Sequence, residues 1–284
     1  MGRYRKILVA VDGSQTSMHA LEESFKLAQN EGSWITVVSV MPRYTGDLDL
    51  LVVGNVMAAL RKPCDETLRK AEELAKSHKV LVKTVCAEGE PHERIIDLAT
   101  SENCDLIVMG RRGLHRLERA LMGSVTARVI GYSPIDILVV TRDSVVGWQR
   151  VLLATDGSKY SKAAEKRAID FAKSYGGELK VISVVDVPPE FYAESPETAE
   201  ELVKKAKEYV GNVRKRADLE GIKTETFVRE GEAYQVITNL AKDQNINTIV
   251  MGAHGKTGLK RLLMGSVTEK VIGYAPCPVL VVKA

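Results

Sequence analysis

The octapeptide KILVAVDG at residues 6–13 returns as RVLLATDG at residues 150–157. Later, LMGSVT at 121–126 and VIGYSP at 129–134 return as LMGSVT at 263–268 and VIGYAP at 271–276. The offset between copies is 144 residues at the start and 142 near the end. Long matches in the same order at nearly constant offset indicate an internal duplication. We therefore predict two copies of one domain, at residues 1–142 and 148–284, with a short connector.

Each copy alternates apolar runs with helical patterns. In copy one we predict strands at residues 7–11, 35–40, 80–86, 106–109 and 135–140. The first helix should end near Gly32, the second helical region should break at Pro63, and a helix should start near Pro91. In copy two, Ser195 and Pro196 are typical of a helix start.

This alternation predicts an α/β fold. Strands that are apolar almost throughout are typical of a parallel sheet covered by helices on both faces. We expect two tandem doubly wound domains, each with a five-stranded parallel sheet. In such sheets ligands bind at the carboxyl ends of the strands, where the strand order reverses.

Composition and charge exclude several classes of partner. The 40 basic and 37 acidic residues nearly cancel, leaving a net charge of +3. The longest basic cluster, at residues 214–216, lies on a helix rich in Glu and Lys, so we interpret it as a solvated face. We predict no nucleic-acid partner.

The chain carries no membrane or metal signature. No stretch approaches the roughly 18 apolar residues of a membrane span, and the apolar run after Lys6 is too short for a signal peptide. The four cysteines lack Cys-x-x-Cys and zinc-ligand spacing, and Cys86 and Cys104 lie in apolar segments typical of reduced, buried thiols. We expect a cytoplasmic protein with no membrane contact.

An aspartate ends the first strand of each copy. Asp12 and Asp156 are both followed by glycine. A carboxylate there is well placed to accept hydrogen bonds from a ribose or a base edge. Equally, it can cap the following helix or shape the turn.

A glycine-rich loop follows the fourth strand of each copy, with the shared spacing G-x-x-G-x9-G-S. It comprises Gly110, Gly113, Gly123 and Ser124 in copy one and Gly252, Gly255, Gly265 and Ser266 in copy two. Glycines let the backbone approach phosphates and adopt positive φ, and the last Gly-Ser opens a helix whose N–H groups hold negative charge. The hydroxyls of Ser124, Ser266, Thr126 and Thr268 can add donors. The alternative is a turn with a simple serine cap, but two copies at identical spacing favour an anion site.

Other phosphate motifs fail. Residues 255–257 read GKT like the end of a P-loop, but the required upstream glycine is replaced by Val250. A G-x-G-x-x-G dinucleotide fingerprint is absent from the sequence.

With these motifs, the chain resembles the universal stress protein (UspA-like) family along essentially its whole length, in the tandem form. The first-strand Asp-Gly-Ser and the G-x-x-G-x9-G-S loop are similar to those of its ATP-binding branch. The resemblance implies an adenine nucleotide α-hydrolase-like fold with strand order 3-2-1-4-5 and ATP as ligand. It also implies pairing of domains through the last strand, so we expect a homodimer.

The resemblance implies a set of nucleotide-binding residues in each copy. The strand-one aspartates would meet ribose or adenine, Val40 and Val184 would meet adenine through their backbone, and the loops would hold ribose and phosphates. The set is Ala10, Val11, Asp12, Val40, Met109, Gly110, Gly113, Gly123, Ser124, Val125 and Thr126 in copy one, and Ala154, Thr155, Asp156, Val184, Met251, Gly252, His254, Gly255, Gly265, Ser266, Val267 and Thr268 in copy two.

The copies differ inside the loop. Copy one has Arg111-Arg112, which can grip phosphate or fold across the site and obstruct it. Copy two has Ala253-His254, close to the small-residue-plus-His form common in the ATP-binding branch, and His254 can contact phosphate or shape the turn.

These residues favour a regulatory ATP-binding protein of the stress response, without a dedicated catalytic set or a metal site. ATP is the expected ligand, with or without Mg²⁺, and ADP or AMP are alternatives. A slow ATPase or autophosphorylating enzyme is a second hypothesis. A scaffold with one vestigial site is a third. The apolar residues 48–60 add either an interface or an ordinary helix start.

Overall fold

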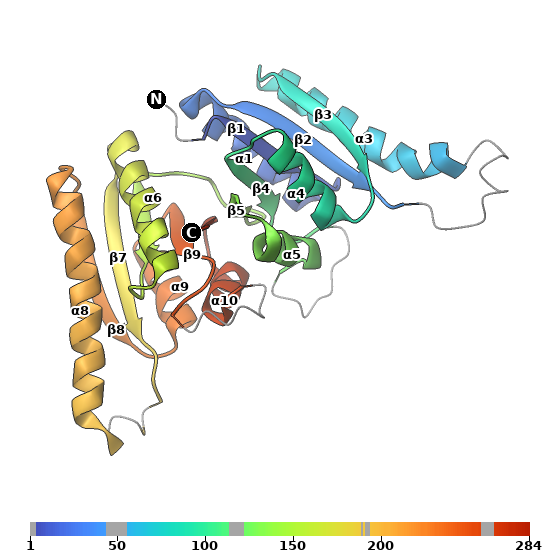
Figure 1. The fold of residues 1–284 in the computed structure, drawn as a ribbon. Coiled ribbons are helices and arrows are strands. Elements are labelled where there is room, and N and C mark those ends of the chain that lie inside the picture. The colour runs from blue at the N-terminus through green and yellow to red at the C-terminus, as the bar shows by residue number, and fades with distance from the viewer. Residues whose placement is uncertain (1–3, 44–55, 114–121, 189, 191–193, 257–263) are drawn as a thin grey trace. The chain divides into compact units, whose positions relative to one another are not determined.

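The computed structural model describes residues 4–43, 56–113, 122–188, 190, 194–256 and 264–284. The chain divides into two compact units, Met1–Asp143 and Ser144–Ala284, each with its own parallel strands and helices (Figure 1). Most of the apolar stretch 48–60 lies outside the described residues.

The first unit alternates strands and helices along the chain. Its elements are β1 (Lys6–Ala10), α1 (Gln15–Glu31), β2 (Trp34–Met41), α3 (Val56–Ser77), β3 (Val82–Glu88), α4 (Pro91–Ser101), β4 (Leu106–Gly110), α5 (Ser124–Tyr132) and β5 (Asp136–Val140). The strands pair in parallel in the order β3-β2-β1-β4-β5. Helices α1 and α3 contact one another and the strands, while α4 packs on β2, β3 and α5.

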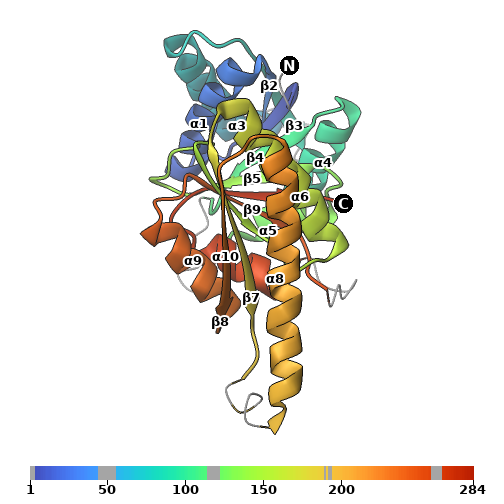
Figure 2. The same cartoon turned by 90° about the vertical axis from the view of Figure 1, so that its left-hand side faces the viewer.

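The second unit repeats this plan. Its elements are β6 (Arg150–Ala154), α6 (Lys159–Tyr175), β7 (Glu178–Val185), α8 (Pro196–Leu219), β8 (Thr224–Glu230), α9 (Ala233–Asp243), β9 (Thr248–Gly252), α10 (Ser266–Tyr274) and β10 (Val279–Val282). The parallel order is β8-β7-β6-β9-β10, with α8 lying along β7 and β8 (Figure 2). The predicted fold class and the strand order 3-2-1-4-5 are confirmed in both units.

Burial of apolar strands and helix faces holds each unit together. Every residue of β4 and β9 is buried, as the near-continuous apolar runs predict. On α1, Leu21 and Phe25 are fully buried, each contributing roughly 1.5–3 kcal/mol relative to exposure. Gly32 ends this helix in the left-handed conformation, with φ of 69°, as predicted.

Two local predictions differ from the structure. Helix α3 runs through Pro63 without interruption. Proline has no amide to pair with the carbonyl of Ala59, but both residues are exposed, so water can reach that carbonyl. Strand β3 starts at Val82 instead of residue 80, because the amide of Val80 bonds to Ala75 O and closes the helix. The predicted start of α8 is confirmed, because Ser195 is its N-cap and Pro196 its first residue, although the Ser195 side chain makes no capping hydrogen bond.

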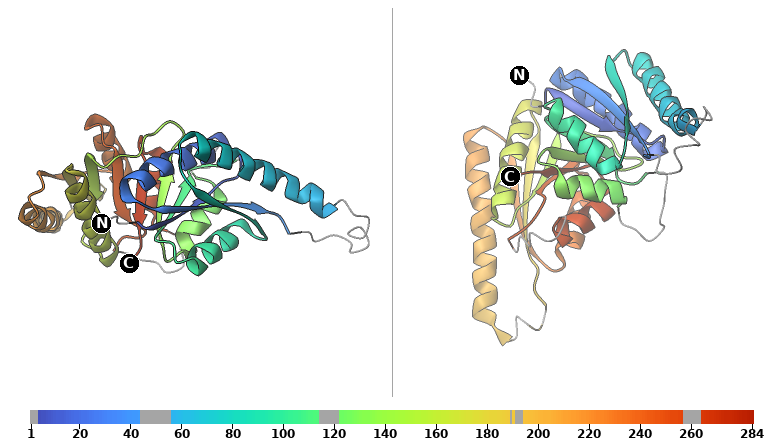
Figure 3. Two further views of the ribbon diagram at one scale, coloured as in Figure 1. Left: turned by 90° about the horizontal axis from the view of Figure 1, so that it is seen from above. Right: turned by 45° about the vertical axis from the view of Figure 1, so that its right-hand side comes forward.

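The expectation that Cys86 is a reduced thiol is wrong. Cys86 on β3 forms a disulfide with Cys64 on α3, and their Cα atoms lie 6.1 Å apart. Helix α3 packs along β2 and β3, which brings the two cysteines within bonding range (Figure 3). Cys104 and Cys277 are buried free thiols, as Cys104 was predicted to be.

The basic cluster on α8 is exposed, but its last member reaches inward. Arg214 pairs with Asp218 at 3.7 Å, whereas Arg216 donates to the buried carboxylate of Glu165. Across the described residues, none of the helices is both long and apolar enough to cross a bilayer.

Candidate functional site

The aspartate after the first strand shapes the turn that follows it. Asp12 Oδ1 accepts the amide of Ser14 at 3.0 Å, and Asp156 Oδ1 accepts the amide of Ser158 at 3.0 Å. The helix-capping role falls to those serines, which accept the amides three residues on. The aspartates were expected either to cap the following helix or to shape the turn if they bind no ligand. The structure shows that they shape the turn.

The second carboxylate oxygen faces the loop after the fourth strand. Asp156 Oδ2 accepts the amide of Lys256 at 2.9 Å. In the first unit, a Cβ placed on Gly113 would overlap Asp12 Oδ2. The aspartates therefore join the two loops at the carboxyl edge of the sheet, as the strand order requires.

The glycines of the fourth-strand loop serve close packing. A Cβ on Gly252 would lie 2.7 Å from Tyr160 Cβ, and one on Gly110 would lie 3.0 Å from Thr16 Cγ2. The prediction that these loops need positive φ is wrong, because their glycines are outside that region. Positive φ is found instead at Gly13 and Gly157, in the turn after the first strand.

Each loop closes on itself where the next helix begins. The amide of Gly123 donates to Arg111 O at 2.9 Å, and that of Gly265 donates to Ala253 O at 2.9 Å. These two glycines are the N-caps of α5 and α10, in an extended conformation. Their own amides are therefore engaged within the loop.

The first turn of each helix presents amides that precede its first internal hydrogen bond. In α5 these are the amides of Ser124, Val125 and Thr126, which precede the first carbonyl-paired amide at Ala127. A glycine cap has no side chain to accept them. Ser266, Val267 and Thr268 occupy the same places in α10. This end of a helix favours negative charge.

The threonine hydroxyls hold the loop. Thr126 Oγ1 donates to Gly110 O at 3.0 Å, and Thr268 Oγ1 donates to Gly252 O at 3.0 Å. Both side chains are buried. The suggestion that the Thr126 and Thr268 hydroxyls donate to phosphate is therefore corrected. The side chains of Ser124 and Ser266, in contrast, are exposed at the helix start.

The second strand extends past the end of the first. Val38 O accepts the amide of Val11 at 2.9 Å, and Ile182 O accepts that of Thr155 at 2.9 Å. Peptide groups alternate sides along a strand, so those of Val40 and Val184, two residues on, point the same way. They face the space beyond the end of the first strand.

The remaining predicted residues are strand ends and supports. Ala10, Val11, Met109, Met251 and Thr155 are buried, and Ala154 is half-buried. The hydroxyl of Thr155 donates to the carboxylate of Glu165 at 3.0 Å. These side chains build the edge of the sheet under the loops.

The two loops carry different charges. Arg111 and Arg112 are half-buried, and burial, followed by the neighbouring Arg112, lowers the pKa of Arg111. Two cations held together and partly desolvated favour an anion beside them. In the second unit, the ring of His254 lies 5.2 Å from that of Tyr160.

Sequence reasoning missed the wall that the second helix of each unit, α3 or α8, adds to the site. Thr67 on α3 approaches Gly13, where a Cβ would lie 2.9 Å from its hydroxyl, and Tyr209 on α8 covers Gly157 in the same way at 2.5 Å. Lys256 Nζ donates to Tyr209 Oη at 2.9 Å. The 142-residue offset pairs Thr67 with Tyr209 and was the signal available.

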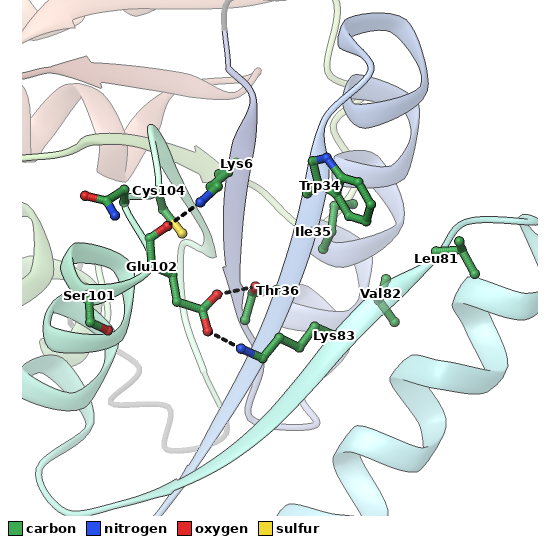
Figure 4. A pocket seen from close by; sticks show the side chains of 11 residues that line it. Lys6, Trp34, Ile35, Thr36, Leu81, Val82, Lys83, Ser101, Glu102 and Cys104 are labelled. Atoms are coloured by element: carbon green, nitrogen blue, oxygen red, sulfur yellow. Dashed lines mark hydrogen bonds and ion pairs between the residues drawn. The ribbon is translucent and has the colours of Figure 1, made fainter.

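A hollow bounded by described residues lies at the opposite edge of the first sheet (Figure 4). It measures about 480 Å³ and lies between the amino ends of the strands and the end of α4. Burial raises the pKa of Glu102, but hydrogen bonds from Lys83 and Thr36 outweigh it, so the pKa lies below its usual value. The hollow contains none of the predicted site residues.

Within the described residues, no group of three or more His, Cys, Asp or Glu side chains is arranged to hold a metal ion.

A model of the universal stress protein family matches residues 3–141 and again residues 147–283. The chain belongs to the universal stress protein family. A universal stress protein of Mycolicibacterium smegmatis is 28% identical, covering 98% of this chain and 96% of that protein. One from Methanocaldococcus jannaschii is 41% identical over 141 residues, covering 48% of this chain and 82% of that protein.

A crystal structure of a universal stress protein from Archaeoglobus fulgidus superimposes with a TM-score of 0.73. Its sequence is 26% identical, and the match covers 98% of this chain and 96% of that one. Both units are therefore universal stress protein domains in tandem.

Proposed function

We propose that each unit binds an adenine nucleotide, ATP foremost, and that binding serves regulation in the stress response. The observation that carries this is the glycine-capped start of α5 and α10. In both units a closed loop holds three first-turn amides at the carboxyl edge of the sheet. Such a helix start binds phosphate groups without a dedicated side chain.

The other end of the nucleotide has matching groups. The peptide groups of Val40 and Val184 extend beyond the first strand, where an adenine edge can exchange hydrogen bonds with them. Asp12 and Asp156 lie between this position and the loop, and a carboxylate can accept ribose hydroxyls besides the amides it already accepts. The family resemblance of the motif points to the same ligand.

Two further parts of the proposal concern assembly and turnover. A homodimer joined through the last strands stays a prediction, which light scattering at micromolar concentration tests. Binding measured with and without Mg²⁺ tests whether the ion accompanies the nucleotide. A phosphate-release assay tests whether the bound nucleotide is hydrolysed.

The direct test places a charge at the cap of each helix. Gly123 has an extended backbone and 3.5 Å of clearance to the nearest atom around a built Cβ, and Gly265 is equivalent, so Asp fits at both. Asp is also a good N-cap, so folding should be kept. Gly123→Asp and Gly265→Asp should each remove one of two ATP sites by calorimetry, weakening that site at least about hundredfold through like-charge repulsion.

Gly123→Asn and Gly265→Asn are the matched controls, because they keep the shape and the cap without the charge. They should weaken binding less than the Asp variants. The wild-type chain giving no heat with ATP, ADP or AMP, with or without Mg²⁺, would contradict the proposal. So would unchanged binding in the double Asp variant.

A further inference from the structure

The Cys64–Cys86 disulfide lies beside the proposed nucleotide site of the first unit. It joins α3 to β3, and Cys86 pairs in register with Ser39 on β2. The sulfur of Cys64 lies 3.5 Å from the carbonyl oxygen of Ser39. The next residue, Val40, is the one whose peptide groups extend past the first strand.

The same helix forms a wall of the site. Thr67 lies one turn after Cys64 on the same face of α3, and its side chain approaches Gly13 in the turn that follows Asp12. The disulfide therefore anchors α3 at the point where the helix meets both the end of β2 and the turn after β1.

The second unit keeps this arrangement without the bond. Helix α8 places Tyr209 against Gly157, as α3 places Thr67 against Gly13. At the positions equivalent to Cys64 and Cys86, 142 residues on, it has Ala206 and Val228. Val228 pairs with Ser183 on β7, as Cys86 pairs with Ser39 on β2. The chain thus contains its own redox-insensitive counterpart.

We propose that reversible oxidation of Cys64 and Cys86 regulates nucleotide affinity at the first site only. This rests on the proposed function. In the oxidised form the bond holds α3 in place, so less conformational freedom is lost when the nucleotide binds and affinity is higher. In the reduced form α3 is free to move away from β3, and affinity falls.

The chemistry balances as thiol–disulfide exchange with a small dithiol or a protein dithiol. A thiolate attacks one sulfur and the Cys64–Cys86 bond breaks, giving a mixed disulfide; the second thiol of the reductant resolves it. Two thiols form on the protein, and the reductant becomes a disulfide, with two electrons and two protons transferred. Cys86 is half-buried on the edge strand β3, so an incoming thiolate can reach it.

The other two thiols are poor competitors. Burial raises the pKa of Cys104 to about 11 and that of Cys277 to about 12, so both stay protonated and unreactive near neutrality. Alkylation of the native protein after reduction therefore reports on Cys86, the half-buried member of the pair.

The test isolates the first site with Gly265→Asp and compares the two redox states. ATP affinity is measured by calorimetry after oxidation with glutathione disulfide and after reduction with dithiothreitol, with alkylation and mass spectrometry confirming each state. We expect the ATP affinity of the first site to be about five- to tenfold weaker in the reduced protein. This is the loss expected when the nucleotide must order helix α3 on binding. Cys64→Ala/Cys86→Val, which installs the second unit's residues, should show one affinity, equal to the reduced value, in both conditions.

The Gly123→Asp chain, in which only the second site remains, should not respond to redox state. Equal affinities of the first site in both states would overturn the inference while leaving nucleotide binding intact. A redox response that persists in the Ala/Val variant would also overturn it. If that variant does not fold, titration of the wild-type chain in both states decides, because only one of its two sites should weaken. Failure of both sites to bind would contradict the proposed function itself.

Discussion

The two units build the same backbone around the proposed site and surround it with different side chains. The loop closes through a 2.9 Å hydrogen bond in each, from Gly123 to Arg111 and from Gly265 to Ala253. The threonine hydroxyl holds the loop through a 3.0 Å bond in each. The side chains inside the loop, in contrast, are two arginines in one unit and alanine and histidine in the other.

This difference separates two tasks. In the proposed sites, peptide groups would supply the phosphate contacts, so the duplicated backbone would be enough to give both units a site. Side chains would then set how strongly and under which conditions each proposed site binds. The contrast extends into the core, where the second unit has a polar network at positions that are apolar in the first.

The polar network in the core of the second unit gives the prediction with the largest expected effect on stability. In the second unit, buried Glu165 accepts from Thr155 and from Arg216, whereas the equivalent positions in the first unit are Val11, Leu21 and Leu74. Arg216→Leu should destabilise the second unit by about 2 kcal/mol, because it leaves a buried carboxylate without its cation. The value is below that of a fully buried pair because the Arg216 side chain is 51% exposed. Urea unfolding measures it.

Transplanting the whole apolar set should reverse the loss. Thr155→Val/Glu165→Leu/Arg216→Leu copies the first unit and should bring stability to within about 1 kcal/mol of wild type, or above it. If the triple variant is less stable than Arg216→Leu alone, the two cores are not interchangeable and the comparison fails at this point.

The loop contrast predicts the next effect. In the Gly265→Asp chain, Arg111→Ala/Arg112→His gives the first site the second unit's loop residues. ATP affinity should fall about tenfold, or about 1.4 kcal/mol, because two partly desolvated cations beside the phosphates are lost. AMP, with one phosphate, should lose less. Calorimetry with both nucleotides measures the difference.

The reverse exchange, Ala253→Arg/His254→Arg in the Gly123→Asp chain, should strengthen ATP binding at the second site. Added salt should reduce both changes, since the gain is electrostatic. Stronger ATP binding after the arginines are removed from the first site would show instead that they obstruct it.

The fold was predictable from the sequence because it depends on short-range patterns. Apolar runs mark the buried strands, and the repeated Asp-Gly and Gly-Ser motifs lie at the carboxyl edge, where both sites are proposed. The start of α5 at Ser124 and the end of α1 at Gly32 follow from cap chemistry, which is local.

What could not be predicted depends on packing between distant segments. Pairing of Cys64 with Cys86 needs the position of α3 over β3, which no local pattern contains. The glycine loops were expected to need positive φ, but Gly113 and Gly252 are glycine because Asp12 and Tyr160 leave no room for a Cβ. The same holds for Thr126, whose donor is taken by Gly110 O across the loop.

The amino ends of the strands supply the smallest test. In the second unit Glu178 accepts from Lys223 at 3.0 Å, and this bond, more than the opposing effect of burial, lowers the pKa of Glu178. In the first unit Glu102 accepts from Lys83 at 2.6 Å, but there burial is the largest influence and opposes the lowering. Both pairs are at the surface, so each contributes little to stability, as is typical of exposed pairs.

Lys223→Met should lower stability slightly near neutral pH, and Lys83→Met should lower it more, because Glu102 then keeps its partly desolvated charge with less compensation. A carboxylate whose pKa is lowered in the folded state stabilises the fold at pH values above its usual pKa of 4.5. That contribution is lost as the pH falls through the folded-state pKa. The deficit of each variant should therefore shrink in urea unfolding series taken from about pH 7 down to about pH 3. A deficit that is constant across this range would assign the effect to lost packing of the lysine stems, and the two edges would then differ in shape rather than in charge.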